Sequence, residues 1–479
     1  MKKITSLFIL IFLIQSQAFS FCGFYVAKAD TKLFNDKSQV ILVRDGKRTV
    51  VTMSNDFKGN VKDFAMVVPV PEILREKNIR VVDRDLFDKI DAYSAPRMAE
   101  YYDPNPCLMR KDEMGWSDFS LDFDKRFLMI AENEIDEEGD YHVQVEAEYS
   151  IEEYDVLILS AEESNGLSRW LIDNGYKIPE GAEEVLEPYI KNDMKFFVVK
   201  VNLEKLPVSQ QGYLRPLQIE FNSEQFMLPI RLGMANAKKS QDMLVYTFTK
   251  QGRVEASNYR TVKMPTDRDI PLFVKDKNEF GEFYFDLFEK KYQQEGRKAV
   301  FLEYAWNVTP NGGMKCDPCV SPPPVFQEFA NAGVDWVKDM SWQSNVFFTR
   351  LHVRYSRDKF PQDLLFQETP NSEAFQCRYV VHNPAKDVNP SCEMAQKYFE
   401  EVKQRRQREV DELAALAGWE STRYAKYINE FDEYLEQDEP EVELNKSTVV
   451  EDNGTIYVLL LMAALMIAVY RKKPKSFMP

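Results

Sequence analysis

Two cysteines separated by two residues, in Cys316-Asp317-Pro318-Cys319, form the pattern in this chain that points most directly to chemistry. With this spacing, one thiolate can attack a mixed disulfide that the other has formed. Such a site needs its first thiol at a helix N-terminus, where the dipole lowers the thiol pKa. Here three prolines at 322–324 follow, and they favour an extended chain. We therefore expect a disulfide that ties a loop, with a redox-active Cys316–Cys319 pair as the alternative.

Other candidate chemistry is sparse. The three histidines are His142, His352 and His382, and none has a metal-binding spacing such as His-Glu-x-x-His. A zinc site made of His352, His382 and the two cysteines is a remote third alternative. The sequence lacks a Gly-x-Ser-x-Gly elbow, a phosphate loop and a dinucleotide fingerprint. Carboxylates are too numerous for a catalytic pair to be chosen, so we predict no metal, no cofactor and no assignable catalytic residue.

The remaining cysteines suggest further disulfides. Six cysteines outside the terminal segments suit an oxidising compartment, namely Cys22, Cys107, Cys316, Cys319, Cys377 and Cys392. We predict the pairs Cys22–Cys107 and Cys377–Cys392 beside the Cys316–Cys319 bridge. Closing the loop between Cys377 and Cys392, of about 15 residues, would contribute roughly 3 kcal/mol in the chain-entropy description.

An apolar run from Thr455 to Tyr470 indicates on which side of a membrane the preceding residues lie. The run contains no charge, glycine or proline, and Arg471 and Lys472 open the basic tail 471–479. At 1.5 Å per residue it spans roughly 24 Å against a hydrocarbon core of about 30 Å, a gap that local thinning can close. We predict a single transmembrane helix at 455–470 with a cytoplasmic tail.

The N-terminus has the pattern of a signal peptide. Lys2 and Lys3 precede an apolar run at 7–14 and then small or polar residues, which predicts a signal peptide at 1–20. Residues 21–435 then form an extracytoplasmic domain, with sub-boundaries near 135 and 310. The acidic residues 436–454 form a linker. We therefore predict a single-pass cell-membrane protein whose N-terminal domain is periplasmic or extracellular.

The exterior part is strongly acidic. The chain has 61 Lys+Arg and 77 Asp+Glu; six of the basic residues lie in the signal and the tail, so the exterior carries 55 − 77 = −22. Such a surface repels nucleic acid, because phosphates are bound by basic patches. The expected partners are the membrane, through the C-terminal helix, and other envelope proteins.

Hydrophobic periodicity predicts an α+β fold. The clearest element is a hairpin of 39–43 and 49–53 around Asp45-Gly46. Further strands are expected at 63–71, 141–149, 155–159, 196–201, 217–221, 226–230, 243–249, 254–262, 299–306, 347–355 and 377–381. Helices are expected at 85–95, 166–173, 181–191, 281–294 and 422–435, with a long helix from Asn389-Pro390 to about Gly418. The fold is thus largely antiparallel strands with interspersed helices and a helical C-terminal segment.

Several segments resemble a known bacterial family. They are Cys22-Gly23-Phe24-Tyr25-Val26-Ala27, residues 63–71, Ala95-Pro96-Arg97, residues 229–233, the Cys316–Cys319 motif and residues 413–419. In this order they resemble the secreted family catalogued as domain of unknown function 2330, over roughly residues 21–420. The resemblance implies no activity and no role for any residue.

Together these observations favour a membrane-anchored extracytoplasmic protein with a non-catalytic binding or scaffolding role in the cell envelope. The alternative is a thiol–disulfide oxidoreductase that uses Cys316 and Cys319, and a hydrolase with scattered carboxylates ranks third. A deep pocket with convergent polar groups would favour an enzyme, and a flat exposed apolar patch would favour a binding protein.

Overall fold

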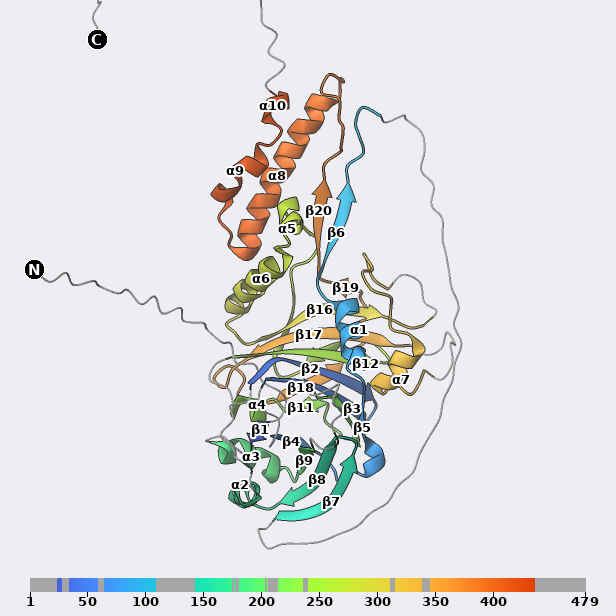
Figure 1. The fold of residues 1–479 in the computed structure, drawn as a ribbon, viewed down its shortest axis with the longest axis vertical. Coiled ribbons are helices and arrows are strands. Elements are labelled where there is room, and N and C mark those ends of the chain that lie inside the picture. The colour runs from blue at the N-terminus through green and yellow to red at the C-terminus, as the bar shows by residue number, and fades with distance from the viewer. Residues whose placement is uncertain are drawn as a thin grey trace, which may run out of the picture. The chain divides into compact units, whose positions relative to one another are not determined.

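The structure, a computed structural model, describes part of the chain (Figure 1). The described residues are 24–27, 34–58, 64–108, 143–174, 176, 181–202, 205, 214–235, 240–310, 315–337 and 345–435. The chain divides into a unit Met1–Glu430 and a unit Phe431–Pro479. In the second unit, the described residues include the short helix α10 (Asp432–Leu435). The elements below belong to the first unit.

A nine-stranded sheet is the largest element. Its strands follow the order β14-β16-β17-β12-β2-β3-β10-β5, and β19 pairs with β16. Their bounds are Phe34–Asp45 (β2), Arg48–Lys58 (β3), Ile79–Val81 (β5), Leu217–Asn222 (β10), Gln241–Thr249 (β12), Arg260–Lys263 (β14), Ala299–Asn307 (β16), Phe347–Tyr355 (β17) and Phe375–Gln376 (β19). The predicted hairpin is confirmed, because β2 and β3 pair antiparallel across Gly46-Lys47. Gly46 has a φ of 60°, which glycine adopts without strain in a tight turn.

A five-stranded sheet has the order β1-β4-β9-β8-β7, with antiparallel pairs throughout. Its strands are Phe24–Ala27 (β1), Phe64–Val70 (β4), Val143–Ile151 (β7), Tyr154–Ala161 (β8) and Lys195–Val201 (β9). Helices α2 (Ser164–Asp173) and α3 (Ala182–Lys191) cover one face, where Leu167 and Leu186 share a core with Val67.

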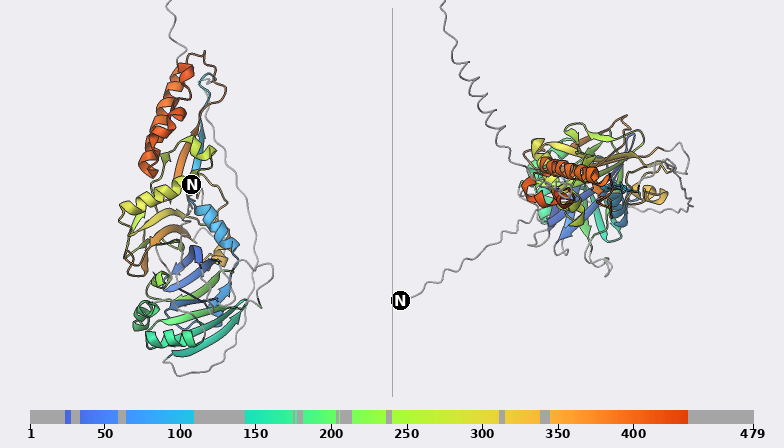
Figure 2. Two further views of the ribbon diagram at one scale, coloured as in Figure 1. Left: turned by 60° about the vertical axis from the view of Figure 1, so that its left-hand side comes forward. Right: turned by 90° about the horizontal axis from the view of Figure 1, so that it is seen from above.

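The two sheets pack face to face because side chains alternate in direction along each strand. Val40 of β2 shares a core with Val68 of β4. Its neighbour Ile41 packs on the opposite face, against α1 (Asp85–Ser94) and α7 (Phe326–Ala332). The order of layers is therefore helices, nine-stranded sheet, five-stranded sheet, helices (Figure 2).

Two three-stranded sheets and the remaining helices complete the unit. The order β15-β20-β6 is parallel, and the order β11-β18-β13 is antiparallel. The strands are Arg97–Tyr102 (β6), Met227–Leu228 (β11), Val254–Ala256 (β13), Arg268–Asp269 (β15), Leu364–Glu368 (β18) and Arg378–Asn383 (β20). The helices and 3-10 turns are Glu76–Asn78 (η2), Arg231–Ala235 (α4), Leu272–Asp276 (α5), Phe280–Gln294 (α6), Ala395–Ala417 (α8), Ser421–Tyr424 (η4) and Ala425–Ile428 (α9).

The predicted α+β class with many antiparallel strands is confirmed, but some element bounds are wrong. The strand expected at 254–262 is broken by a bend at 257–259 into β13 and β14. The long helix begins at Ala395, because the Asn389 side chain and carbonyl accept hydrogen bonds from the amides of Ser391 and Cys392 and form a separate turn. The helix expected at 422–435 is instead the turn η4 and two short helices, α9 and α10.

Among the residues that the structure describes, no helix combines the length and apolar character needed to cross a bilayer. The predicted signal peptide 1–20, linker 436–454, transmembrane helix 455–470 and tail 471–479 lie outside the described residues. The same holds for the predicted boundary near 135, and the boundary near 310 stays a prediction.

Candidate ligand-binding cavity

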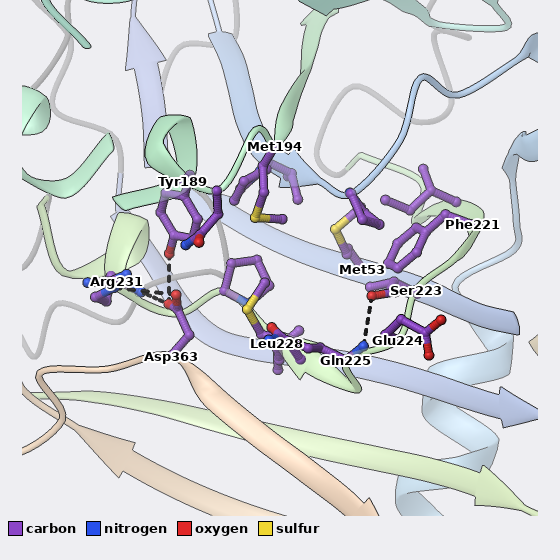
Figure 3. A pocket seen from close by; sticks show the side chains of 18 residues that line it. Met53, Tyr189, Met194, Phe221, Ser223, Glu224, Gln225, Leu228, Arg231 and Asp363 are labelled. Atoms are coloured by element: carbon purple, nitrogen blue, oxygen red, sulfur yellow. Dashed lines mark hydrogen bonds and ion pairs between the residues drawn. The ribbon is translucent and has the colours of Figure 1, made fainter. Parts of the chain in front are cut away.

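A cavity of about 320 Å³ lies between the two large sheets (Figure 3). Its walls come from β3 and β10 on one side and from β4 and the segment before β9 on the other. The walls are largely apolar, formed by Val51, Met53, Val68, Pro69, Met194, Ile219, Phe221 and Leu228. The volume falls within the range of small-molecule sites, about 300–1,000 Å³.

One end of the cavity is polar and centred on Asp363, the residue before β18 (Figure 3). Its Oδ1 accepts a hydrogen bond from the Tyr189 hydroxyl at 2.7 Å and from the backbone amides of Ile230 at 2.9 Å and Arg231 at 3.1 Å. Its Oδ2 accepts one from Nε of Arg231 at 3.3 Å. Four donors therefore hold a buried carboxylate, which leaves it little capacity to accept a further hydrogen bond.

The two side chains beside Asp363 differ in what they offer. Burial, followed by the charge of Asp363, raises the pKa of Tyr189 well above its ordinary value, so the phenol stays a protonated donor. The guanidinium carbon of Arg231 lies 5.3 Å from the centroid of the Tyr189 ring. The guanidinium pairs with Asp363 through Nε at 3.3 Å, and it also acts on the Tyr189 hydroxyl, whose pKa it lowers against the larger effect of burial. The polar end thus presents a phenol that stays protonated and a guanidinium that is paired with Asp363 through one of its three nitrogens.

The opposite lip of the cavity is a short loop between β10 and β11. Its Ser223 carbonyl accepts a hydrogen bond from Nη2 of Arg44 at 2.9 Å, and the Ser223 hydroxyl accepts one from the amide of Gln225 at 3.1 Å. Glu224 pairs with Lys47 of the hairpin turn. These contacts fix the lip to the hairpin turn between β2 and β3.

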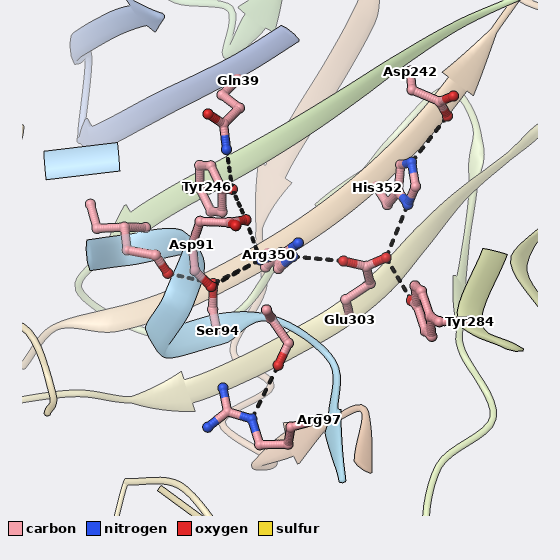
Figure 4. A network of polar contacts seen from close by, with 12 residues as sticks. Gln39, Asp91, Ser94, Arg97, Asp242, Tyr246, Tyr284, Glu303, Arg350 and His352 are labelled. Atoms are coloured by element: carbon pink, nitrogen blue, oxygen red, sulfur yellow. Dashed lines mark hydrogen bonds and ion pairs between the residues drawn. The ribbon is translucent and has the colours of Figure 1, made fainter. Parts of the chain in front are cut away.

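A second polar cluster is buried on the other face of the nine-stranded sheet (Figure 4). Glu303 accepts a hydrogen bond from Nε of Arg350 and one from the Tyr284 hydroxyl, each at 2.6 Å. It also lies 3.0 Å from Nδ1 of His352, whose Nε2 lies 3.0 Å from Asp242. Carboxylates engage both ring nitrogens of His352, so this imidazole ties β12, β16 and β17 together rather than facing a ligand.

Comparison with known families identifies the family to which the chain belongs. Residues 16–367 match a family described as an uncharacterized protein conserved in bacteria, DUF2330, and this range is more than half of the chain. The chain belongs to this family. The predicted resemblance is thereby confirmed, although the match ends before residues 413–419. No curated protein and no solved structure matches the chain.

The cysteines of this DUF2330 protein pair differently from the prediction. Cys316 and Cys319 form the expected disulfide. Cys107 bonds to Cys392 and Cys377 is a buried free thiol, so the predicted pairs Cys22–Cys107 and Cys377–Cys392 are wrong. The reason is topological: β6 and β20 run parallel and side by side, so the segments that follow them, which carry Cys107 and Cys392, meet. Cys22 itself lies outside the described residues.

The other predicted candidates are not brought together. His352 belongs to the buried cluster, and His382 lies 3.3 Å from Asp269, away from the Cys316–Cys319 disulfide. In the described part of the chain, no group of three or more His, Cys, Asp or Glu side chains is arranged to hold a metal. His142, Thr455, Tyr470, Arg471 and Lys472 lie outside the described residues.

The sequence did not single out Tyr189 or Asp363, which lie 174 residues apart and carry no motif. Arg231 stands in the segment 229–233, one of those that resemble the DUF2330 family. That segment and residues 63–71, which also resemble the family and include Val68 and Pro69 of the cavity wall, were the signals in the sequence that pointed toward the cavity.

Proposed function

We propose that this DUF2330 protein is a membrane-anchored binding module of the cell envelope that holds a small amphipathic anion in the cavity between its sheets. One observation carries the proposal: a cavity with apolar side chains along its walls ends at the guanidinium of Arg231, which one carboxylate, Asp363, holds through Nε. Such a guanidinium favours a carboxylate, which accepts two parallel hydrogen bonds from it.

The apolar walls favour a flexible aliphatic body. Met53 and Met194 project into the cavity beside Phe221 (Figure 3), and methionine side chains adapt to ligands of different shape. Each buried methylene contributes about 0.8 kcal/mol, so the seven apolar carbons of octanoate gain about 5.6 kcal/mol before the cost of association. Hydrogen bonds to the guanidinium add about 1.5–3 kcal/mol and association costs at least about 4 kcal/mol, so we expect only weak, millimolar binding of a simple fatty acid.

The chemistry of the polar end supports binding rather than catalysis. The Asp363 carboxylate already accepts four hydrogen bonds, and the pKa of Tyr189 is raised, chiefly by burial. General acid–base catalysis needs a group that exchanges a proton near the working pH. The Tyr189 phenol does not meet that requirement, and the hydrogen-bonding capacity of the Asp363 carboxylate is already occupied.

The membrane location in this proposal is supported by the sequence. The signal pattern at 1–20 and the apolar run 455–470 with its basic tail favour a single-pass arrangement with the cavity outside the cytoplasm. The charge of −22 in the exterior part disfavours nucleic acid as a partner, and envelope components remain the proposed ligands.

Methionine NMR of the full chain in lipid nanodiscs tests the cavity. Octanoate should shift the ¹³C-methyl resonances of Met53 and Met194, assigned through Met→Leu substitutions. Octylamine, which carries the opposite charge, should not. A Met194→Trp variant should lose the octanoate response because the indole fills the cavity. An Ile172→Trp variant, altered at an exposed position of α2, should keep it.

Two results would contradict the binding proposal. One is the absence of any octanoate shift at Met53 and Met194, and the other is an unchanged response in Met194→Trp. Either would leave a scaffolding role. Flotation of the full chain with liposomes tests the anchor separately, since a protein that binds octanoate yet stays in the aqueous fraction would retain the cavity and lose the membrane assignment.

A further inference from the structure

The Cys316–Cys319 disulfide has one accessible and one protected sulfur. Cys319 is exposed, whereas Cys316 is only 2% exposed. The loop is held in place by Gln376, whose side chain donates to the Asp317 carbonyl at 2.9 Å. A thiolate attacks only the disulfide sulfur that it can reach, so the geometry directs attack to Cys319.

Two buried cations that have no carboxylate partner among the described residues adjoin the cysteine motif. Lys315 directly precedes Cys316, and its Nζ lies 3.5 Å from the Val308 carbonyl, a long contact. Arg97 donates to the Pro318 carbonyl, inside the cysteine motif, at 3.0 Å and to the Ala95 carbonyl at 3.1 Å. Within the described residues, neither cation forms an ion pair. A buried cation without a counter-ion is costly, and an anion formed next to it is stabilised.

The carboxylate inside the motif does not cancel this positive field. Asp317 lies 2.6 Å from Nη1 of Arg378, which neutralises it. Burial lowers the pKa of Lys315 to about 8, which leaves the amine mostly protonated at pH 7. The positive charge beside Cys316 therefore persists under neutral conditions.

Exposed apolar residues follow the accessible sulfur in sequence; we call Val320, Pro322, Pro323 and Val325 the collar. Val320 is 61% exposed and Val325 is 48% exposed, and Pro322 and Pro323 between them are exposed as well. Prolines hold this segment extended, so it presents apolar surface at little entropic cost. Apolar surface around an accessible disulfide suits docking of another protein rather than of a small hydrophilic thiol.

We propose that Cys316–Cys319 is a redox-active site that accepts two electrons from the dithiol of a partner protein docked on this collar. One thiolate of the dithiol attacks Sγ of Cys319, the Cys316–Cys319 bond breaks, and its electron pair leaves on Cys316 as a thiolate held by Lys315 and Arg97. The second thiolate of the dithiol attacks the mixed disulfide and releases Cys319. Two electrons and two protons pass to the cysteine pair, and the dithiol becomes a disulfide. This activity is separate from the cavity and does not rest on the ligand proposed for it.

The Cys107–Cys392 disulfide of the same molecule serves as an internal control for reduction of Cys316–Cys319. It joins residues 285 positions apart. Full chain in nanodiscs is pulsed with dithiothreitol or with reduced thioredoxin as a protein dithiol, and then alkylated and mapped by mass spectrometry. Cys316 and Cys319 should become alkylated while Cys107 and Cys392 remain joined, and thioredoxin should act faster than dithiothreitol at equal concentration.

Variants test the assigned roles. Lys315→Met keeps the buried aliphatic stem and should shift the reduction equilibrium toward the disulfide, about tenfold for each pKa unit of lost thiolate stabilisation. Lys89→Met is the matched control, because Lys89 faces the same proline segment but pairs with Glu328 at 3.0 Å. A thioredoxin variant that keeps only its attacking cysteine should stay joined by a mixed disulfide to Cys319 of the unaltered protein, and not to Cys316, because it has no second thiolate to release Cys319.

Several outcomes would overturn the proposal. Equal reduction of both disulfides, or reduction of Cys316–Cys319 only once the protein unfolds, would make it a structural bridge; this comparison uses the unaltered protein and needs no variant to fold. A Lys315→Met protein that melts normally with an unchanged equilibrium would remove the role of the cation. Trapping through Cys316 rather than Cys319 would reverse the direction of attack.

Discussion

Replacing Arg350 with methionine should destabilise the protein strongly, because Arg350 is the centre of the buried cluster in Figure 4. Its Nε donates to Glu303 at 2.6 Å and its Nη1 to Asp91 of α1 at 2.8 Å. Although burial opposes ionisation of Glu303, the charges of Arg350 and His352 hold its pKa well below the ordinary range. The substitution therefore leaves a buried carboxylate that has lost its strongest counter-ion.

The expected cost follows from this geometry. Removing one partner of a buried ion pair typically costs about 3–5 kcal/mol. His352 and the Tyr284 hydroxyl still contact Glu303, so we expect Arg350→Met to lower the free energy of unfolding by about 3 kcal/mol, at the lower end of that range. The control is Lys47→Met, which breaks a pair whose side chains are 67% and 78% exposed, and should cost less than about 1 kcal/mol.

Urea unfolding of both variants, followed by tryptophan fluorescence and circular dichroism, measures these costs. A double variant Arg350→Met/Glu303→Gln should recover part of the loss, because it removes the stranded charge as well. If Arg350→Met costs no more than Lys47→Met, or if the double variant is no more stable than Arg350→Met alone, the buried pair does not stabilise the fold as argued.

Two further predictions concern pH and packing. The carboxylates of Glu303 and Asp242 outweigh burial and raise the pKa of His352, so its contribution to stability is full below the unfolded value of about 6.5 and is lost as pH rises through the folded pKa. His352→Gln should remove that slope, of up to about 1.4 kcal/mol per pH unit, from a plot of unfolding free energy against pH; an unaltered slope would mean that another group titrates. Gly252→Ala should lower the melting temperature clearly, because a Cβ there would lie 2.5 Å from the Thr369 carbonyl oxygen. Gly281→Ala, with no atom within 4 Å of its Cβ, should not lower it, and equal melting temperatures would contradict the packing argument.

Local pattern was a good guide to single elements of this DUF2330 protein. The Asp45-Gly46 turn predicted the β2–β3 hairpin because the signal lies within a few residues, and Gly418, with a φ of 80°, ends α8 where the sequence placed its end. The start of α8 was missed because the Asn389 side chain closes its own turn rather than capping the helix. Turn and capping residues of this kind predict where a single element begins or ends, because they act over only a few residues.

Long-range pairings were beyond such reasoning. Cys392 was paired with its neighbour in sequence, Cys377, whereas the parallel pairing of β6 with β20 brings Cys107 to it instead. The cavity was missed for the same reason. Its polar end joins Tyr189 of α3 and Asp363, and periodicity within one element carries no information about which distant element will face it.

The Cys107–Cys392 bridge also determines what a protease can accomplish. A single cut of the backbone anywhere between these two cysteines leaves both fragments in one covalent molecule, because the disulfide spans 285 residues of the chain. The strands before the cut stay bound to the start of α8 and so to everything C-terminal of it. A nicked protein therefore migrates as one species until it is reduced, and only cleavage outside the span from Cys107 to Cys392 releases a fragment.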